Sequence, residues 1–289
     1  MALSFDQRDG DIWYNGEFMP WADAKVHVLN HGLHYASCVF EGERAYSGKI
    51  FKDREHTERF HKSAEHLNFT IPYSVDELMA VKAELLKRNN IVDGYFRPVA
   101  WRGSEMMAIS AQKNTIHVAI AAWPWPSMYN PEMRAKGIRL GHAKFKRPSP
   151  ETALCASKAA GLYMICTVSK HEAEDRGFDD ALMLDYRGYL AEATGANLFL
   201  VIDGALHTPT PDCFLDGITR RTVMDLARAR GIEVVERHMK PEELEKAQEV
   251  FLTGTAAEVT PVGEIQGQSF EVGPITQQLI ADYEAAVRA

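Results

Sequence analysis

A lysine among small residues is the side chain in this sequence that is best suited to covalent chemistry. Lys158 lies in Cys155-Ala156-Ser157-Lys158-Ala159-Ala160-Gly161, where its neighbours leave room for a flat, bulky group to approach the amine. A lysine that is desolvated, or that lies beside another cation, loses its proton more easily and becomes a nucleophile toward a carbonyl. The segment alone also fits a solvated lysine on a helix, which is the more common setting.

An acid in a second stretch of small residues could pair with such a flat group. Glu192 lies in Leu190-Ala191-Glu192-Ala193-Thr194-Gly195-Ala196-Asn197-Leu198-Phe199, which we interpret as a turn that leads into an apolar strand. Burying a carboxylate is costly unless a positive group pairs with it, and a protonated pyridine nitrogen is such a group. A turn carboxylate in water is an equally good interpretation of this segment taken alone.

Two further segments are typical of phosphate-binding turns. In Leu215-Asp216-Gly217-Ile218-Thr219-Arg220, a glycine and a hydroxyl residue stand at the expected start of a helix, and in Thr253-Gly254-Thr255-Ala256-Ala257-Glu258 a strand runs into Gly-Thr. Free backbone N–H groups and the helix dipole favour an anion at such places. Each segment could also be an ordinary helix cap. One lysine, one acid and two anion sites therefore gather in the second half of the chain.

The histidines raise the possibility of a metal site. His27, His31 and His34 have ligand-like spacing, and His56, His61 and His66 follow. The spacing fits neither a zinc finger nor an HExxH motif, and no acid lies at a matching offset. We therefore predict no metal and place these histidines at the surface or at the edge of a pocket.

Composition narrows the function classes. The 289 residues are 46% hydrophobic and 25% charged, and 32 basic against 40 acidic side chains give a net charge of −8. This is a globular composition, and the absence of a basic block argues against nucleic-acid binding. The four cysteines are too scattered for a disulfide framework or a cysteine zinc site. Because the N-terminus has no apolar core like that of a signal peptide and no apolar run could span a bilayer, we expect a soluble cytoplasmic protein with no membrane partner.

Local signals in the first half predict strands mixed with helices. Asn15-Gly16 between strand formers predicts a hairpin over Asp11–Pro20. Apolar spacing predicts a helix over Asp53–Leu67, and a capping box over Ser74–Glu77 opens another. Strands are predicted at Tyr95–Trp101 and Thr115–Trp123.

A proline-rich stretch then separates the halves. Trp123–Pro131 holds three prolines in nine residues, so we predict an interdomain loop at 123–133 between domains at 1–122 and 134–289, although a surface loop is an alternative. The second half is predicted to contain strands at Ile138–Ala143, Asp180–Asp185, Leu198–Ile202 and Glu249–Leu252. Helices are predicted at Lys158–Arg176, Thr219–Arg230, Pro241–Ala247 and Pro274–Val287. The chain is predicted to be a mixed α/β protein of two domains.

Taken together, these motifs resemble those of the class IV aminotransferases, the fold type IV pyridoxal-phosphate enzymes, and above all the branched-chain amino acid aminotransferases. The resemblance runs from about Ile12 to Val287. Its most specific stretches are His34-Tyr35 through Val39-Phe40-Glu41-Gly42, Ala156-Ser157-Lys158, Glu192–Phe199, Leu215–Arg220 and Thr253–Glu258. The resemblance implies a two-domain α/β fold with pyridoxal 5′-phosphate (PLP) in the interdomain cleft.

The resemblance implies a role for each residue that matches a cofactor motif of the family. Lys158 would bind the cofactor covalently and move a proton between the substrate α-carbon and the cofactor C4′. Glu192 would pair with the pyridine nitrogen and keep it protonated. Arg59 would hold the phosphate, since a guanidinium suits a dianion, and Tyr163 would hydrogen-bond the phenolic oxygen. The remaining cofactor-binding residues would be Leu215 against the ring and Gly217, Ile218, Thr219, Gly254 and Thr255 around the phosphate.

For the substrate, Tyr95-Phe96-Arg97 matches a Tyr-x-Arg strand of the family that handles the α-carboxylate together with the Thr255-Ala256-Ala257 turn. Arg44 matches an arginine that would serve the distal carboxylate of glutamate. A small aliphatic pocket separates substrates by only about 1–3 kcal/mol per methylene, so leucine, isoleucine and valine should all be accepted. The pocket would be lined by Phe40, Gly42, Trp125 and Tyr163, with Tyr35 from the other subunit of a homodimer.

Two stretches depart from the family pattern. Met128 stands where an aromatic residue is expected, with Tyr129 next to it. Trp101–Met107 differs from the usual glycine-rich loop, and Arg102 and Glu105 could alter which acceptors are taken. Neither stretch includes a residue of the cofactor set.

The resulting hypothesis is a PLP-dependent transaminase for branched-chain L-amino acids, with 2-oxoglutarate as the acceptor in a ping-pong cycle. Two alternatives keep the cofactor: transamination of D-amino acids or (R)-amines, and a lyase such as aminodeoxychorismate lyase. A third is a cofactor-binding or regulatory protein without turnover. Tyr95 and Arg97 favour the first hypothesis, while the preferred donor and the oligomer size beyond a dimer stay open.

Overall fold

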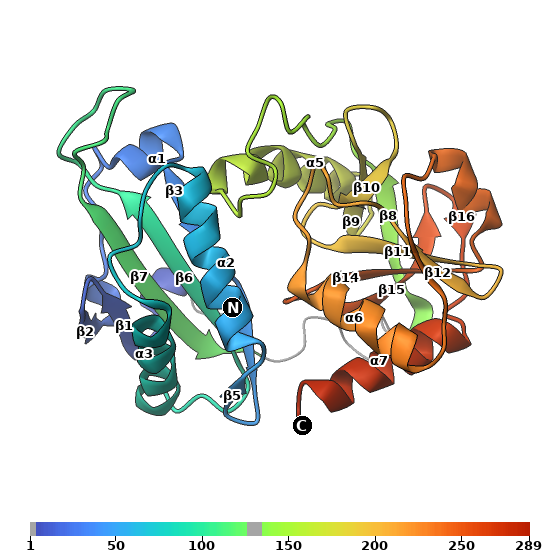
Figure 1. Cartoon of the computed structure of the whole chain (residues 1–289), viewed down its shortest axis with the longest axis horizontal. Coiled ribbons are helices and arrows are strands. Elements are labelled where there is room, and N and C mark those ends of the chain that lie inside the picture. Colours follow the sequence, from blue (N-terminus) through green and yellow to red (C-terminus); the bar gives the residue numbers. More distant parts are fainter. Residues whose placement is uncertain (1–3, 126–134) are drawn as a thin grey trace. The chain divides into compact units, whose positions relative to one another are not determined.

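The computed structural model describes residues 4–125 and 135–289, which form two compact units. Unit 1 comprises the chain up to residue 126 together with Ser157–Gly161, and unit 2 comprises residues 127–156 and 162–289. Both units contain helices and strands, which confirms the mixed α/β prediction (Figure 1). The predicted loop at 123–133 and the domain limits beside it stay predictions, and Met128 and Tyr129 lie outside the described residues.

Unit 1 begins with the hairpin that its Asn-Gly pair predicts. Strand β1 (Asp11–Tyr14) pairs antiparallel with β2 (Glu17–Pro20). Asn15 and Gly16 connect them with φ angles of 49° and 102°, the positive values that a two-residue type I′ turn requires.

The hairpin forms one edge of an antiparallel sheet. Within the described residues the order is β2-β1-β7-β6-β4-β5, and β3 pairs with β6. Strands β6 and β7 confirm the two strands predicted there. The remaining bounds are β3 (Cys38–Phe40), β4 (Glu43–Tyr46), β5 (Lys49–Ile50), β6 (Gly94–Arg102) and β7 (Ile116–Pro124).

Two helices, α2 (Asp53–His66) and α3 (Val75–Arg88), cover one face of this sheet, and both confirm predictions (Figure 1). Ser74 and Glu77 form the expected capping box at the start of α3. Because successive strand residues point to opposite faces, Phe96 packs toward the helices and its neighbours Tyr95 and Arg97 point the other way. The shorter helices are η1 (Phe5–Gln7), η2 (Trp21–Asp23) and α1 (His31–Tyr35).

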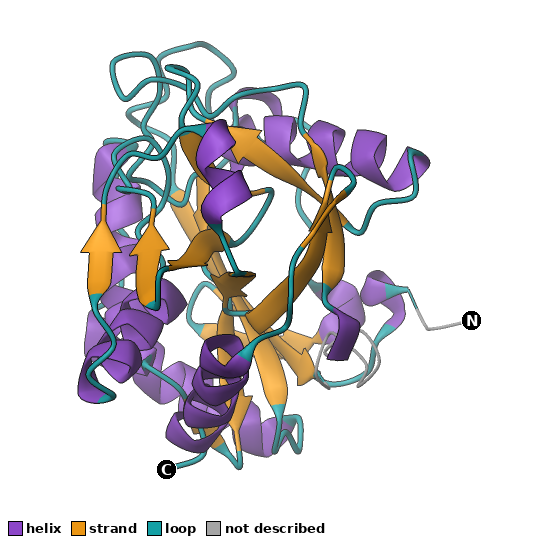
Figure 2. Cartoon of the chain, turned by 90° about the vertical axis from the view of Figure 1, so that its right-hand side faces the viewer, coloured by secondary structure: helices purple, strands orange, loops and turns teal. Residues whose placement is uncertain are grey.

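Unit 2 is built on strands that close into a ring. The pairing of β10 with β11 joins the ends of the run β10-β9-β8-β15-β14-β11, and β12, β13 and β16 extend it. Figure 2 faces this unit, whose strands curve around an apolar core that includes Leu140, Leu198 and Val262. The strand bounds are β8 (Ile138–His142), β9 (Asp180–Leu184), β10 (Leu190–Ala193), β11 (Asn197–Ile202), β12 (Ala205–Thr208), β13 (Val234–Glu236), β14 (Glu249–Gly254), β15 (Glu258–Ile265) and β16 (Gln268–Ser269).

The helices of the second half begin close to their predicted starts, with one exception. Helices α6 (Ile218–Ala229) and α7 (Pro274–Ala286) confirm two predictions, and the segment predicted as a helix at 241–247 is a 3-10 helix, η4 (Pro241–Lys246). The helix predicted from Lys158 was wrong at its start, because it begins as the 3-10 helix η3 (Ala160–Tyr163) and continues as α5 (Met164–Asp175).

Two other local predictions need correction. Glu192 lies on strand β10 and not in the predicted turn, which is formed by Thr194–Ala196. No helix follows Thr255, since β14 returns directly as β15 and leaves a tight hairpin turn at 255–257. Among the described residues no helix is both long and apolar enough to span a bilayer. Cys38, Cys155, Cys166 and Cys213 are all free thiols.

Candidate active site

Lys158 lies on a non-helical segment of unit 1 that is fixed from both sides. Its backbone N–H donates to Ser63 Oγ of α2 at 3.0 Å, and its carbonyl accepts from the Phe40 N–H at 3.1 Å. The next residue, Ala159, pairs with Val39 of β3. The half-buried lysine therefore projects from a braced backbone, and its Nζ lies 5.1 Å from the centroid of the Phe40 ring.

Arg59 of α2 is held by a buried acid. Its Nε and Nη2 donate to the two oxygens of Glu41 at 2.7 and 2.9 Å, and His56 Nδ1 lies 2.8 Å from the same carboxylate. Burial alone would raise the pKa of Glu41, but Arg59 and His56 outweigh burial and hold that pKa far below its usual range. The guanidinium is thus fixed in one orientation, as a phosphate-binding arginine must be.

The histidines of this region need a correction. His56 is buried against Glu41, and His31 is buried with its Nε2 3.0 Å from the Ala108 carbonyl. The expectation that all the histidines lie at the surface or at a pocket edge was therefore wrong for these two.

The sheet face of unit 1 that α2 and α3 do not cover collects most of the predicted substrate residues. Arg44 lies opposite Tyr95 in the β4–β6 register, and Arg97 Nη2 donates to the Tyr95 hydroxyl at 3.1 Å. Arg97 lies over the Phe40 ring at 4.8 Å, and the Tyr95 and Trp125 rings are 5.8 Å apart. Gly42 contacts the same tyrosine so closely that an added Cβ would lie 2.0 Å from its hydroxyl oxygen.

Two donors on this face have unused hydrogen-bonding capacity. The Nε of Arg97 and the Nε1 of Trp125 are buried and have no hydrogen-bond partner among the described residues. Since buried donors are nearly always satisfied in a functioning protein, they suit a ligand with anionic or carbonyl oxygens. Tyr35 is elsewhere in unit 1, exposed at the end of α1 with its ring 4.6 Å from His31.

The contacts of Arg102 are with backbone carbonyls and an aromatic ring. It is buried, donates to the carbonyls of Leu67, Asn68 and Ala111, and lies over the Phe69 ring. It therefore satisfies carbonyls at the C-terminal end of α2, which gives the arginine a structural reason to depart from the family pattern.

In unit 2, Glu192 is buried beside two polar groups. Its Oε1 lies 3.3 Å from Nε of Arg147, and its Oε2 accepts from Asn197 Nδ2 at 3.2 Å. Burial is the largest effect and would lower the pKa of Arg147, but Glu192 together with Cys166, Tyr163 and Cys155 outweighs burial and raises that pKa. The buried carboxylate therefore has a guanidinium and an amide as partners, without which its burial would be costly.

The start of α6 has the form of an anion site. Its N-cap residue, Gly217, has no side chain to accept from the first N–H groups, and Ile218 and Thr219 are the first residues of the helix. Asn197 Nδ2 also donates to the Leu215 carbonyl at 3.0 Å, so the same asparagine links Glu192 to this loop. The structure thus brings Glu192 together with Leu215 and Gly217.

The hairpin turn after β14 lies beside this group. A Cβ on Gly254 would stand 3.3 Å from the Gly195 carbonyl and 3.5 Å from the Ala196 Cβ, so the two turns are neighbours. Thr255, Ala256 and Ala257 form the turn and are half-buried. Tyr163 ends η3 and is also half-buried. The predicted site residues therefore form two groups, one in each unit.

The residues that hold these groups in place were not predicted from the sequence. Asn197 lay inside a quoted motif but received no role, and Glu41 was quoted only as part of a motif. Arg147 comes from a segment with no distinguishing pattern beyond Lys146-Arg147-Pro148. The signal that could have found them is charge balance, because each buried acid or arginine needs a partner of opposite charge.

One cluster has the composition of a metal site. Asp185, Asp212 and Cys213 bring possible ligand atoms within 4.8 Å of one another. Arg187, however, donates to Asp185 at 2.8 Å and to both oxygens of Asp212, so a guanidinium already supplies the positive charge there.

Comparison with known proteins shows which family the chain resembles. The model of the family described as amino-transferase class IV matches residues 38–265. A probable branched-chain-amino-acid aminotransferase of Rickettsia felis is 43% identical, over 99% of this chain and 99% of that protein. The branched-chain-amino-acid aminotransferase of Pseudomonas aeruginosa is 40% identical, over 97% of this chain and 94% of that protein.

Solved structures agree with this result. A branched-chain amino acid aminotransferase from T.th., solved with pyridoxamine 5′-phosphate, has a TM-score of 0.94 at 38% identity, covering 97% of this chain and 94% of that one. The Escherichia coli branched-chain amino acid aminotransferase also has a TM-score of 0.94, at 37% identity, covering 97% of this chain and 95% of that one. On its fold, its site residues and a family match over most of its length, this chain belongs to the class IV aminotransferases.

Proposed function

We propose that this protein is a PLP-dependent aminotransferase that transfers the amino group of branched-chain L-amino acids to 2-oxoglutarate. Relatives that are 40–47% identical to this chain over most of their length are named branched-chain-amino-acid aminotransferases, or probable ones. The observation that carries the proposal lies on the open sheet face of unit 1. There Lys158, the aromatic ring of Phe40 and the buried donors of Arg97 and Trp125 occur together.

The residues present fit PLP. The cofactor has an aldehyde, a ring nitrogen and a phosphate, and the chain offers a braced lysine, a buried acid beside Arg147 and an arginine fixed by Glu41. The uncapped N-terminus of α6 at Gly217 supplies a second phosphate contact. Lys158 would carry the covalent link, Glu192 would face the ring nitrogen, and Arg59 with Ile218, Thr219 and Thr255 would hold the phosphate.

When bound, PLP accepts the electron pair that is released at the substrate α-carbon. The chain's own contribution is then proton transfer and orientation. Lys158 would move a proton between the substrate α-carbon and the cofactor, and Glu192 would keep the ring nitrogen protonated. Arg147 balances the charge of Glu192, and the Ser63 and Phe40 contacts keep the Lys158 backbone in place during the transfer.

Substrate recognition follows from the residues around Tyr95. Arg97 and Tyr95 suit the α-carboxylate of an L-amino acid, with Ala256 and Ala257 in the turn that completes this contact. Phe40, Gly42 and Trp125 offer an apolar lining without charge. Arg44 suits the second carboxylate of 2-oxoglutarate, which lets one site accept both an aliphatic and a dicarboxylic partner.

We also propose that the protein works as a homodimer in the cytoplasm. Unit 1 exposes apolar side chains on α1, the segment before it and the 106–109 loop, and His31 fastens α1 to that loop. An apolar surface of this kind marks an interaction site in a soluble protein. A second copy would cover it and bring Tyr35 to the partner's substrate. The exposed residues are Val26, Val28, Leu29, Leu33, Tyr35, Met106, Met107 and Ile109.

The first test is absorption spectroscopy of the purified, PLP-loaded protein during titration with L-leucine. We expect the visible band of the lysine-bound cofactor to disappear, and 2-oxoglutarate to restore it. The Lys158→Ala variant should lose both the covalent link and turnover, and appreciable steady-state transamination by this variant would overturn the assignment.

The alternatives give different results in the same experiment. A response only to D-alanine or (R)-1-phenylethylamine would keep the cofactor and change the substrate. Release of pyruvate from aminodeoxychorismate without an amino acceptor would indicate a lyase. A bound cofactor that responds to no amine would indicate a binding protein without turnover.

A further inference from the structure

Two buried serines hold the segment of Lys158 against the end of helix α2. Ser63 Oγ accepts the Lys158 N–H at 3.0 Å, and Ser157 Oγ donates to the Ser63 carbonyl at 2.9 Å. Ser63 is 0% exposed and Ser157 is 2% exposed, so water does not compete for these bonds. Each serine thus uses its hydroxyl on the backbone of the other segment.

The place of Ser63 in the helix explains this exchange. Helix α2 ends at His66, so the Ser63 carbonyl is one of the last four, which have no partner within a helix. The N–H of Leu67, the residue four positions on, donates to the Ala64 carbonyl instead. Ser157 therefore satisfies a carbonyl that the end of the helix leaves open, and it lies directly before the lysine.

Lys158 and Arg59 belong to one closed ring of contacts. The Lys158 carbonyl accepts from the Phe40 N–H, and the next residue, Glu41, binds Arg59 through its carboxylate. Arg59 and Ser63 lie one turn apart on the same face of α2, and Ser63 accepts the Lys158 N–H. We call these five residues the contact ring. The Lys158 backbone cannot shift relative to the Arg59 guanidinium without breaking a contact of this ring.

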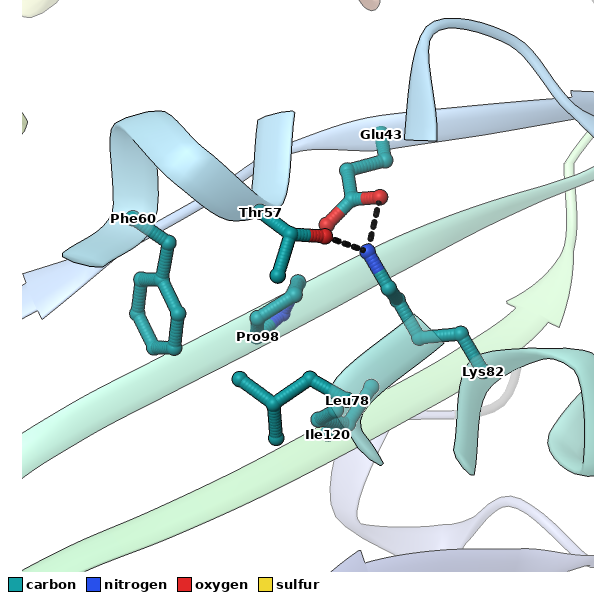
Figure 3. A pocket seen from close by; sticks show the side chains of 7 residues that line it. All are labelled: Glu43, Thr57, Phe60, Leu78, Lys82, Pro98 and Ile120. Atoms are coloured by element: carbon teal, nitrogen blue, oxygen red, sulfur yellow. Dashed lines mark hydrogen bonds and ion pairs between the residues drawn. The ribbon is translucent and has the colours of Figure 1, made fainter. Parts of the chain in front are cut away.

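Helix α2 itself is fixed in the core of unit 1. Lys82 of α3 is 1% exposed, and its ammonium donates to Thr57 Oγ1 of α2 and to Glu43 Oε2 of β4, both at 2.7 Å. It also pairs with Asp53 in the first turn of α2. Figure 3 shows the Glu43 carboxylate and the Thr57 hydroxyl converging on this nitrogen, and the space left in the lining is too small for a water molecule. The helix is therefore held at its start, ahead of the two residues that belong to the contact ring.

We propose that Ser63 and Ser157 are positioning residues, which keep Lys158 at a fixed spacing from Arg59 so that a molecule with both an aldehyde and a phosphate is bound at its two ends at once. The proposal rests on the proposed function, because it takes Lys158 as the residue that bonds the PLP aldehyde and Arg59 as a phosphate ligand. Both serines act through the backbone of Lys158.

The physical reason is that the two ends of PLP are joined by a rigid ring. Once the phosphate is bound, the reaction of the aldehyde with the Lys158 amine, which forms a C=N bond and releases one water, is effectively intramolecular. Such a reaction is favoured only when the spacing of the two sites matches the ligand. If Lys158 occupies the matching position for only part of the time, the apparent affinity for PLP falls by that fraction.

The test uses three probes that share the pyridine ring. PLP offers the aldehyde and the phosphate, pyridoxal offers only the aldehyde, and pyridoxamine 5′-phosphate offers only the phosphate, because its amine cannot bond a lysine. Each probe is titrated into the full-length apoprotein, which gives a Kd without any turnover. The aldehydes are followed by visible absorption and the amine by equilibrium dialysis. Borohydride reduction and peptide mass spectrometry then identify the lysine that has reacted.

Three variants are compared with the native protein. Ser63→Ala removes the acceptor of the Lys158 N–H, and Ser157→Ala removes the donor to the Ser63 carbonyl. The matched control is Ser169→Ala, because Ser169 is a buried serine of α5 whose hydroxyl has no hydrogen-bond partner among the described residues.

For Ser63→Ala we expect the Kd for PLP to rise about three- to tenfold, the size of effect that the loss of one hydrogen bond produces. The Kd values for pyridoxal and for pyridoxamine 5′-phosphate should stay within about twofold, because each of these probes uses only one of the two sites. Ser157→Ala should show the same selective rise, and Ser169→Ala should leave all three Kd values unchanged.

Should Ser63→Ala fail to fold, Ser157→Ala tests the proposal, since it leaves the bond to the Lys158 N–H in place. A similar rise for all three probes, an unchanged Kd for PLP, or the same selective rise in Ser169→Ala would each overturn the positioning role. A wild-type protein that attaches PLP at Lys158 but transaminates no amino acid overturns the proposed function, and the three probes still test the spacing. A wild-type protein in which PLP is not attached at Lys158 overturns the inference itself.

Discussion

The side-chain oxygen of Asn197 lies 2.2 Å from the point at which a Cβ on Gly217 would stand. Asn197 cannot turn away without loss, because its Nδ2 donates both to Glu192 and to the Leu215 carbonyl. Helix α6 must therefore begin with glycine at this position, and a glycine cannot cap it with a side chain. The same contact that orients Glu192 thus leaves the first N–H groups of α6 for an anion.

Gly217→Ala should consequently reduce both stability and cofactor binding. Overpacking at a fixed contact costs about 1–3 kcal/mol, and the displaced Asn197 would release Glu192 and shift the start of α6. We expect the Kd for PLP to rise by about tenfold, a loss of about 1.4 kcal/mol in binding. Urea unfolding of the apoprotein and a PLP titration measure the two effects separately.

A double-mutant cycle identifies the cause of this loss. Asn197→Ala removes the oxygen that the new methyl group meets, so in Asn197→Ala/Gly217→Ala the alanine should cost much less than in the native background. If the cost of the alanine is the same in both backgrounds, the close contact is not the reason for the glycine.

Local signals predicted much of the fold, for a physical reason. The Asn15-Gly16 turn and the Ser74–Glu77 capping box depend only on residues a few positions apart, so the sequence contains the whole interaction. The backbone conformation at Lys158 is a feature that local signals did not predict. The alanine-rich surroundings of this lysine favour a helix, but Ser63 and Phe40, far away in the chain, hold its backbone in a non-helical segment.

The residues of the candidate site were likewise predicted only in part. Motifs and the family resemblance named the groups that would contact the cofactor and the substrate. They did not name Glu41, Arg147 or Lys82, because a partner for a buried charge can come from any element that the fold brings near. Spacing along the chain carries no trace of such pairings.

Arg147→Leu should destabilise the protein by leaving the buried Glu192 without its cation. Removing one member of a buried ion pair costs about 3–5 kcal/mol. Denaturant unfolding of the apoprotein measures this loss.

The matched control for that experiment is Glu192→Gln/Arg147→Leu, which has no charge left to bury. It should be more stable than Arg147→Leu. Identical behaviour of the two variants would mean that Glu192 does not need Arg147.

Gly42→Ala should damage substrate binding more than stability. Its methyl group would lie 2.0 Å from the Tyr95 hydroxyl oxygen and so would push Tyr95 away from Arg97. We expect kcat/KM for L-leucine to fall by at least about tenfold, equivalent to about 1.4 kcal/mol. In Gly42→Ala/Tyr95→Phe the nearest atom is gone, so the alanine should cost less there than in the native background, and an equal cost would contradict the steric explanation.

The pKa of Glu43 predicts how the stability of the protein changes with pH. Burial, reinforced by the neighbouring Asp53 and Glu41 carboxylates, outweighs the opposing effect of Lys82 and raises the pKa of Glu43 from 4.5 to about 7. Between these values the folded protein holds a proton that the unfolded chain has released. The contribution of Glu43 is therefore full below pH 4.5, falls as the pH rises toward 7 and is constant above it.

The slope from this one group reaches at most about 1.4 kcal/mol per pH unit. Glu43→Gln cannot titrate, so the difference in unfolding free energy between the native protein and this variant should shift in favour of the variant between pH 5 and pH 7. Other groups, His56 among them, titrate in both proteins and cancel in that difference. A difference that stays constant from pH 5 to pH 8 would show that Glu43 is ionised throughout, with Lys82 as a full ionic partner.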